Sequence, residues 1–146
     1  MRTPKLTEYN DYATWMTFEV MSNYCVRIIF TEDFNKSAKS RLGYAPQQET
    51  ADAFCFHCKG DGKSYLFLKL DSPEGTIAHE CWHIIFRMFN HCGVRDFDDE
   101  TTAYHLDHMV EQVYKFKNAI QAVKSSTKKE VSHDQSKRRA SSTKRN

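Results

Sequence analysis

The apolar positions along the chain repeat with two spacings, and each spacing predicts one kind of element. Spacings of three and four predict helices over residues 7–23, 33–41, 73–92 and about 99–123. Short runs of β-branched and aromatic residues predict strands over residues 25–30, 52–57 and 64–70. We therefore expect an α+β domain with a small, mostly antiparallel sheet, formed by residues 1–123.

The last two predicted strands give the clearest β signal. Two alternating, aromatic-rich runs flank the turn sequence Asp61-Gly62. A short turn of this type between two alternating strands predicts a β-hairpin. The hairpin would lie directly before the best-marked helix of the chain.

That helix has clear signals at both ends. Ser72 is placed as its N-cap, Pro73 fits the first turn, and Glu74 lies near the positive end of the helix dipole. Gly93 is placed to end the helix. Between these ends runs one apolar stripe, which consists of Ile77, Cys81, Ile84, Ile85, Met88 and Cys92.

The helix carries the sequence His79-Glu80-Cys81-Trp82-His83. Histidines four residues apart share one face of a helix, and both can reach one Zn²⁺ at about 2.0–2.1 Å. Glu80 is placed to take a proton from a zinc-bound water and to pass it to a leaving amine. This pattern predicts a zinc-dependent hydrolase with His79 and His83 as ligands and Glu80 as the base.

A catalytic zinc site needs a third protein ligand, with water in the fourth position. We predict Glu100, because the chain can turn at Gly93 and return antiparallel, which would bring the start of the next helix alongside His83. Asp98 and Asp99 are better suited to capping that helix, and His105 points about 140° away from Glu100. The alternatives for the third ligand are Asp98, Asp99, His105 and His108.

Residues 75–83 and 100–106 together resemble the small metallopeptidases that tailed bacteriophages encode, within the wider zincin group. The resemblance extends over about residues 25–113. It implies a minimal zincin-like fold, Zn²⁺ as cofactor, a glutamate on the next helix (here Glu100) as third ligand beside His79 and His83, and Glu80 as base. It also implies that the hairpin at residues 52–70 provides an edge strand that holds an extended peptide.

The chain differs from the larger gluzincins at one position. These proteins carry an aspartate four residues after the ligand glutamate, where this chain has Tyr104, so a different residue must orient a ligand. The oxyanion of the hydrolytic intermediate also needs a donor. Tyr104, His105 and His108 are the candidates, and Tyr104 is slightly favoured because it lies one turn past Glu100. Its structural alternative is a half-buried core tyrosine.

The five cysteines are predicted to be reduced, because an odd number leaves one unpaired and no export signal is seen. Cys55 and Cys58 form a C-x-x-C pair without a second pair to complete a structural zinc site. They should also point to opposite faces of a strand. Cys81 and Cys92 fit the buried stripe of their helix as small core residues.

Charge is unevenly distributed along the chain. Residues 124–146 carry eight Lys or Arg against Glu130 and Asp134, a net charge of +6, so residues 1–123 carry −4 of the total of +2. An acidic body argues against a protein built throughout to bind nucleic acid. The tail is almost free of apolar residues, which predicts disorder. Its charge allows weak contact with nucleic acid or an acidic partner.

The sequence has no run of 18 apolar residues, which excludes an ordinary transmembrane helix, and residues 1–8 have no secretory signal. We expect no membrane association and a cytoplasmic location, the host cytoplasm if a phage encodes the protein. The leading hypothesis is a zinc metallopeptidase that acts on a peptide or protein substrate. The alternatives are a zincin-like protein without catalysis and a nucleic-acid-associated interaction protein of a phage that acts on host or phage factors.

Overall fold

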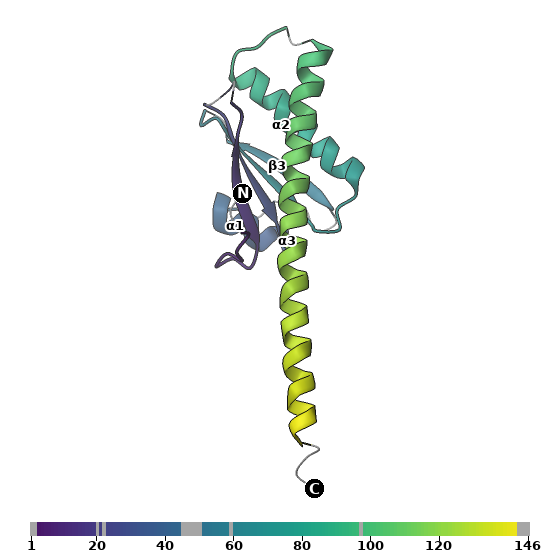
Figure 1. The fold of residues 1–146 in the computed structure, drawn as a ribbon. Helices are drawn as coiled ribbons and strands as arrows, with labels where there is room; N and C mark the ends of the chain where they lie inside the picture. The colour runs from purple at the N-terminus through teal and green to yellow at the C-terminus, as the bar shows by residue number, and fades with distance from the viewer. Residues whose placement is uncertain are drawn as a thin grey trace.

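The computed structural model describes residues 3–142 except residues 20, 22, 45–50, 59 and 97, and of residues 127–142 it describes the backbone alone. Within these residues the chain forms a four-stranded sheet and three helices (Figure 1). The elements in chain order are β1 (Tyr12–Thr17), β2 (Cys25–Phe30), α1 (Phe34–Leu42), β3 (Ala53–Cys58), β4 (Lys63–Leu68), α2 (Glu74–His91) and α3 (Asp99–Ser142).

The sheet is mixed, with strand order β1-β2-β4-β3. The pairs β1–β2 and β3–β4 are antiparallel, whereas the central pair β2–β4 is parallel. A parallel pair needs a crossover connection, and here the chain between β2 and β4 contains α1 and β3. The expected α+β class and the hairpin at β3–β4 are confirmed. β3 forms one edge of the sheet.

Helices cover both faces of the sheet. On one face, the larger core packs β1, β2 and β4 against α2 and α3, with Ile28, Leu66, Ile85 and Met109 among its fully buried members. On the other face, Phe34 and Ala38 of α1 pack against side chains of β2, β3 and β4. Figure 1 shows α3 crossing α2 and then continuing well beyond the sheet. The predicted apolar stripe of α2 is confirmed from Ile77 to Met88.

The helix expected over residues 7–23 is wrong, because this segment forms β1 instead. Tyr12–Thr17 is rich in aromatic and β-branched residues, which favour a strand, and it pairs along its whole length with β2. Met16 and Phe18 alternate into the core as strand residues do. Asn10, which has a positive φ of 60°, lies just before this strand. Val20, part of the same prediction, lies outside the described residues.

The start of α2 also differs from the expected capping. The N-cap is Pro73, and no side chain caps the helix there. The Ser72 hydroxyl instead accepts a hydrogen bond from the Lys69 amide at 2.8 Å and donates one to the Asp52 carbonyl at 2.6 Å. Ser72 therefore ties the entrance of α2 to the start of β3 rather than to the helix itself.

The last helix is longer than expected. α3 has 44 residues, or about 66 Å at 1.5 Å per residue, and its backbone is helical to Ser142, where the sequence predicted a disordered tail from residue 124. Among the side chains that the structure describes, which end at residue 126, Ile120 is the last fully buried one of α3. The domain boundary near Val123 stays a prediction. No described helix combines the length and hydropathy that a membrane crossing needs.

Candidate functional site

The two histidines of α2 meet on the outer side of the helix. The Nε2 atoms of His79 and His83 lie 3.1 Å apart, and the ring planes are nearly perpendicular, at 89°. The residues of α2 that pack in the core, such as Cys81 and Ile84, leave the histidines outside, with His79 exposed and His83 partly exposed. The predicted pairing of these two imidazoles is therefore present in the fold.

The spacing of the two nitrogen atoms fits a shared metal ion. Two nitrogens bound at about 2.0–2.1 Å in tetrahedral geometry lie about 3.3 Å apart, close to the 3.1 Å between His79 and His83. Without an ion, one Nε2–H donates to the other Nε2, so that proton must leave before both can ligate. The chemistry of the pair suits Zn²⁺, which readily takes imidazole nitrogen ligands.

Glu80 turns away from the outer face toward the edge strand of the sheet. Its carboxylate lies close enough to the Cys55 thiol of β3 to affect the pKa of that thiol, and Glu80 is partly buried. Burial together with the charge and hydrogen bond of Glu80 raises the pKa of Cys55 to about 12. The carboxylate that was predicted to act as a base is thus held at the boundary between α2 and β3.

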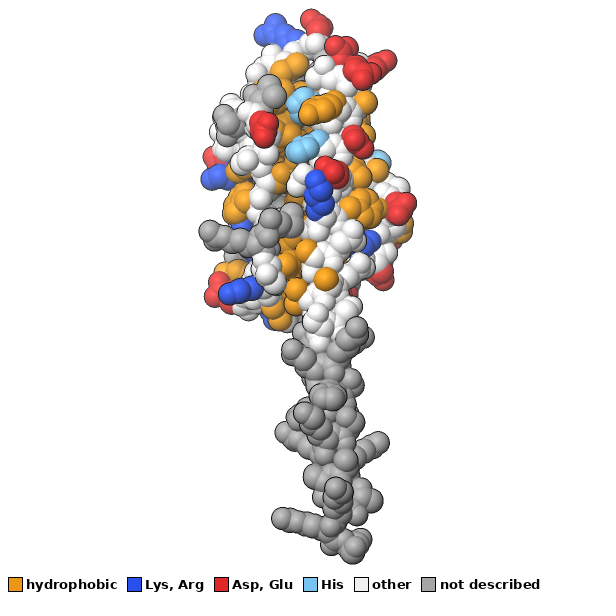
Figure 2. Space-filling view, viewed as in Figure 1, with side chains coloured by type: hydrophobic (Ala, Val, Ile, Leu, Met, Phe, Trp, Pro, Cys, Tyr) orange, Lys and Arg blue, Asp and Glu red, His pale blue; other side chains and the backbone are white. Residues whose placement is uncertain are grey.

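Within the described part of the chain, no third ligand joins the histidine pair. Glu100 is exposed in the first turn of α3, where Figure 2 shows acidic side chains gathered. A hollow of about 330 Å³ beside Trp82 of α2 is lined by Asp99 and not by Glu100. Among the described residues, no three His, Cys, Asp or Glu side chains come together as a metal site would need. Glu100 as third ligand therefore stays a prediction.

The other residues of this region that were candidates for the third ligand or for the oxyanion donor have different surroundings. The Asp98 carboxylate accepts a hydrogen bond of 2.6 Å from the Thr101 amide, so its predicted capping role is confirmed. His105 is nearly buried beside Phe89 and donates through Nδ1 to the Thr101 carbonyl at 2.8 Å. Tyr104 is 71% exposed, so its interpretation as a half-buried core residue is wrong. No contact of Tyr104 or His108 bears on an oxyanion role.

A polar groove that no motif in the sequence predicts runs beside the histidine pair. The groove has a volume of about 560 Å³ and lies between the end of the hairpin and the outer side of α2. It is lined by His57, Gly60, His83, Phe86, Arg87, Asn90 and His91. His83 belongs to both the pair and the groove, so the two are continuous. The only local signal was that His57 shares a strand face with Cys55.

A buried hydroxyl network holds His57 at the wall of this groove. The Tyr24 and Ser64 hydroxyl oxygens lie 2.5 Å apart, and each lies 3.2 Å from Nδ1 of His57. Burial raises the pKa of Tyr24 to about 12, so Tyr24 keeps its proton, and either hydroxyl can donate to the other. Ser64 can then donate to Nδ1, which leaves Nε2–H of His57 as a donor. Burial, together with Arg87 and His91, lowers the pKa of His57.

All five cysteines are free thiols, as predicted. Cys81 is fully buried, and burial raises the pKa of its thiol to about 12. Cys55 packs against the larger core, whereas Cys58 is not part of it, in keeping with their predicted positions on opposite faces of β3. Cys92 is partly exposed at the end of α2 rather than buried.

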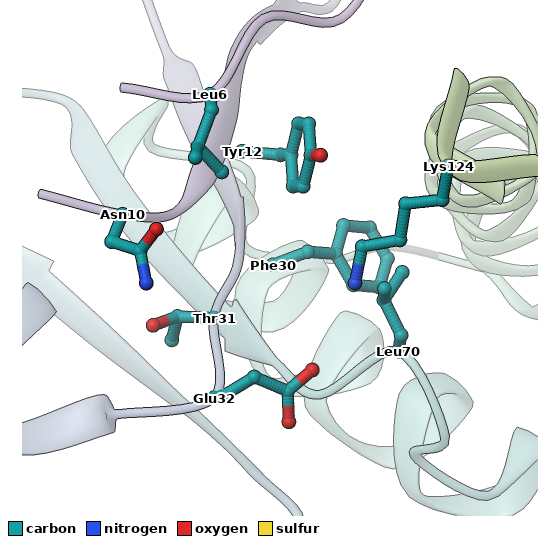
Figure 3. A pocket seen from close by; sticks show the side chains of 8 residues that line it. All are labelled: Leu6, Asn10, Tyr12, Phe30, Thr31, Glu32, Leu70 and Lys124. Atoms are coloured by element: carbon teal, nitrogen blue, oxygen red, sulfur yellow. The ribbon is translucent and has the colours of Figure 1, made fainter. Parts of the chain in front are cut away.

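A second hollow lies at the other end of the sheet (Figure 3). It has a volume of about 220 Å³ and is lined mainly by residues of the N-terminal segment and the strand ends, with Lys124 reaching in from α3. The ammonium group of Lys124 lies 5.9 Å from the ring of Tyr12. No residue of α2 lines this hollow, so it is separate from the histidine pair.

No family model, curated protein or solved structure matches the chain.

Proposed function

We propose that the protein is a zinc-dependent hydrolase that cleaves peptide bonds. The observation that carries this proposal is the 3.1 Å distance between Nε2 of His79 and Nε2 of His83, with Glu80 between them in sequence. The pair suits a divalent ion, and the carboxylate that follows it suits proton transfer. Zinc, when bound, polarises a carbonyl group and lowers the pKa of water.

The residues of the chain have distinct roles in this proposal. His79 and His83 hold the ion, with Glu100 as the predicted third ligand. Glu80 accepts a proton from the attacking water at its carboxylate and delivers that proton to the nitrogen of the leaving amine. Cys55 lies beside Glu80 and has a single S–H to donate, so at least one oxygen of the carboxylate is left for the attacking water.

The edge strand β3 suits an extended peptide as substrate. β3 pairs with β4 on one side and forms the edge of the described sheet on the other. An edge strand offers backbone N–H and C=O groups to an added strand. Because Cys55 of β3 contacts Glu80, a peptide along this edge would pass beside the predicted base.

Metal analysis is the first test of the proposal. The purified full chain should hold close to one zinc per molecule, and the double variant His79→Ala/His83→Ala should lose it. His91→Ala, which removes an imidazole from the same helix outside the pair, is the matched control and should keep the metal. A chain without transition metal, or a double variant that retains zinc, would refute the metal site.

Peptide cleavage tests the role of Glu80. Glu80→Gln should retain zinc but cleave a mixture of quenched fluorescent peptides at least about 100-fold more slowly. This factor is the lower end of what a general base contributes to a rate. Glu74→Gln removes an exposed carboxylate from the first turn of the same helix and should leave the rate unchanged. Equal rates for Glu80→Gln and the parent protein would show that Glu80 is not the base.

The exposed position of Glu100 favours one further candidate, a protein that binds zinc without turnover. In that case zinc would bind through His79 and His83 with labile ligands in the remaining positions, and Glu100→Gln would not alter zinc affinity. If Glu100 is the third ligand, this variant should weaken zinc binding and abolish cleavage together. The two candidates are thus separated by one substitution.

A further inference from the structure

The groove beside the histidine pair has an unusual set of polar side chains. Of its lining residues, one is an arginine, three are histidines and one is an asparagine, and none is acidic. Arg87 forms no ion pair among the residues that the structure describes. Its positive charge nevertheless influences Tyr24, Cys55 and His57, which lie around the groove. The groove therefore presents an uncompensated cation and several N–H donors to solvent.

We propose that this groove binds a carboxylate group of the peptide substrate, with Arg87 as its main partner and His57 and His91 beside it. The inference rests on the proposed peptide hydrolysis and names the feature by which a substrate is recognised. It adds a binding subsite to the histidine pair and Glu80.

The side chains of the groove suit a carboxylate in both charge and geometry. A guanidinium group can donate two parallel hydrogen bonds to the two oxygens of a carboxylate. His57 can add a third donor, because its Nδ1 faces Tyr24 and Ser64 and its Nε2 is left for the groove. Glu80, which lies near Cys55, does not line the groove.

The position of Arg87 limits where the carboxylate lies in the peptide. Arg87 follows His83 by four residues on α2, so their side chains are neighbours about 5–6 Å apart at Cβ. An extended peptide advances about 3.3 Å per residue. A carboxylate at Arg87 therefore belongs to a residue within about two positions of the bond near the histidine pair. It is either an acidic side chain or the C-terminal carboxylate.

Binding of three short peptides tests the proposal and separates these two sources. The probes are acetyl-tetra-alanine with a free C-terminus, the same peptide with a C-terminal amide, and the amide with one alanine replaced by aspartate. Binding to the full chain is followed by the imidazole NMR signals of His57 and His91. Each titration is repeated after chelation, because a carboxylate can also bind zinc directly.

At least one acidic peptide should bind about tenfold or more tightly than the neutral amide, as expected for a hydrogen-bonded charge pair. Arg87→Gln should remove this difference, and Arg87→Lys should retain part of it. Arg95→Gln, a change of the same kind at an exposed arginine outside the groove, should retain all of it. Preference for the free C-terminus alone, or for aspartate alone, identifies the source of the carboxylate.

Two results would overturn the proposal. One is equal affinity of the acidic and neutral peptides for the chelated parent protein, and the other is a carboxylate preference that survives Arg87→Gln. Neither result depends on turnover. A protein that prefers acidic peptides but neither holds zinc nor cleaves them refutes the proposed hydrolysis alone, whereas a protein that cleaves acidic and neutral peptides equally refutes the subsite alone.

Discussion

Arg41 donates a hydrogen bond of 2.7 Å to the carboxylate of Asp11, which links α1 to the segment before β1. The side chain of Asp11 is fully buried and accepts two more hydrogen bonds, from the hydroxyls of Thr7 and Ser37. Burial alone would raise the pKa of Asp11, but the hydrogen bonds from Ser37, Thr7 and Arg41 outweigh it and lower the pKa. The network thus stabilises the charged form.

Asp11→Asn should destabilise the fold by about 3 kcal/mol, because it leaves the guanidinium of Arg41 without its counter-ion. Urea unfolding measures this change. Asp52→Asn, at an exposed pair with Lys69 whose charged atoms are 3.7 Å apart, is the matched control and should change stability by no more than about 0.5 kcal/mol. Comparable losses in the two variants would refute the special role of the buried pair.

The same network predicts a pH dependence of stability. Because the folded pKa of Asp11 is below its ordinary value of 3.8, its contribution is complete above about pH 5 and is lost as the pH falls through the folded pKa. The free energy of unfolding of the parent protein should therefore drop more steeply in this acid range than that of Asp11→Asn. Parallel curves for the two proteins would show that Asp11 does not titrate in this way.

Gly62 is predicted to tolerate no side chain. A Cβ at this position would lie 2.3 Å from the Asn23 carbonyl oxygen and 2.9 Å from Nε2 of His91, on a residue with φ of +60°. Gly62→Ala should therefore cost about 1–3 kcal/mol from overpacking in addition to the backbone cost. Gly60→Ala has a similar φ of +88° but open space, so it should cost only about 1–2 kcal/mol. Thermal unfolding of both variants measures the difference.

The reactivity of the Cys55 thiol should depend on the charge of Glu80. The thiolate is the reactive form, and Glu80 helps to hold the pKa of Cys55 at about 12 after burial, the larger cause. Glu80→Gln should therefore speed alkylation of Cys55 by iodoacetamide several-fold, as measured by peptide mass spectrometry. Cys92, whose pKa is raised by burial without Glu80, should react at an unchanged rate. An unchanged rate at Cys55 would argue against the contact.

The stability of the folded domain should not depend on the end of α3. Removal of residues 127–146 should leave the melting temperature nearly unchanged, because the described core contacts of α3 end at Ile120 and these residues are almost all polar or charged. Removal of residues 116–146 also deletes Phe116 and Ile120 and should cost several kcal/mol, by analogy with large-to-small core changes. Binding of DNA, if the parent protein shows it, should disappear with residues 127–146. These residues carry seven Lys or Arg against two acidic residues, a net charge of +5, and the remaining chain has 2 − 5 = −3.

Much of the fold follows from local signals in the sequence. The β3–β4 hairpin has an Asp-Gly turn, and α2 has a continuous apolar stripe, so both could be predicted from short windows. The segment of β1 was ambiguous, because Tyr12, Trp15 and Met16 fit a helical spacing as well. Its strand form depends on pairing with β2 and on the bonds from Asp11 to α1, which lies 26 or more residues away. Contacts of this range leave no local pattern.

The candidate site was also predictable only in part. His79 and His83 could be predicted as a pair, because four residues along a helix fix their separation. The groove joins His57 of β3 to Arg87 and His91 of α2, and no spacing in the sequence predicts that the hairpin ends beside this part of the helix. The predicted return of Glu100 to the pair depends on the rotation of α3, in which each residue turns a side chain by about 100°. The hollow beside Trp82 is lined by Asp99 of this helix turn, and Glu100 as a ligand stays a prediction.

The sheet consists of two antiparallel pairs, β1–β2 and β3–β4, which are joined by the parallel pairing of β2 with β4. Each antiparallel pair can form between strands that are close in the sequence. The nearest partners of β1–β2 and β3–β4 are 8 and 5 residues apart, Thr17↔Cys25 and Cys58↔Lys63, whereas the central pair joins Cys25 to Lys63 across 38 residues. Closing the longest loop costs the most entropy and slows folding. We expect both hairpins to form early and their docking across Ile28 and Leu66 to limit the folding rate. Stopped-flow kinetics of Ile28→Val and Leu66→Ala should show slowed folding, and an effect confined to the unfolding rate would refute this order of assembly.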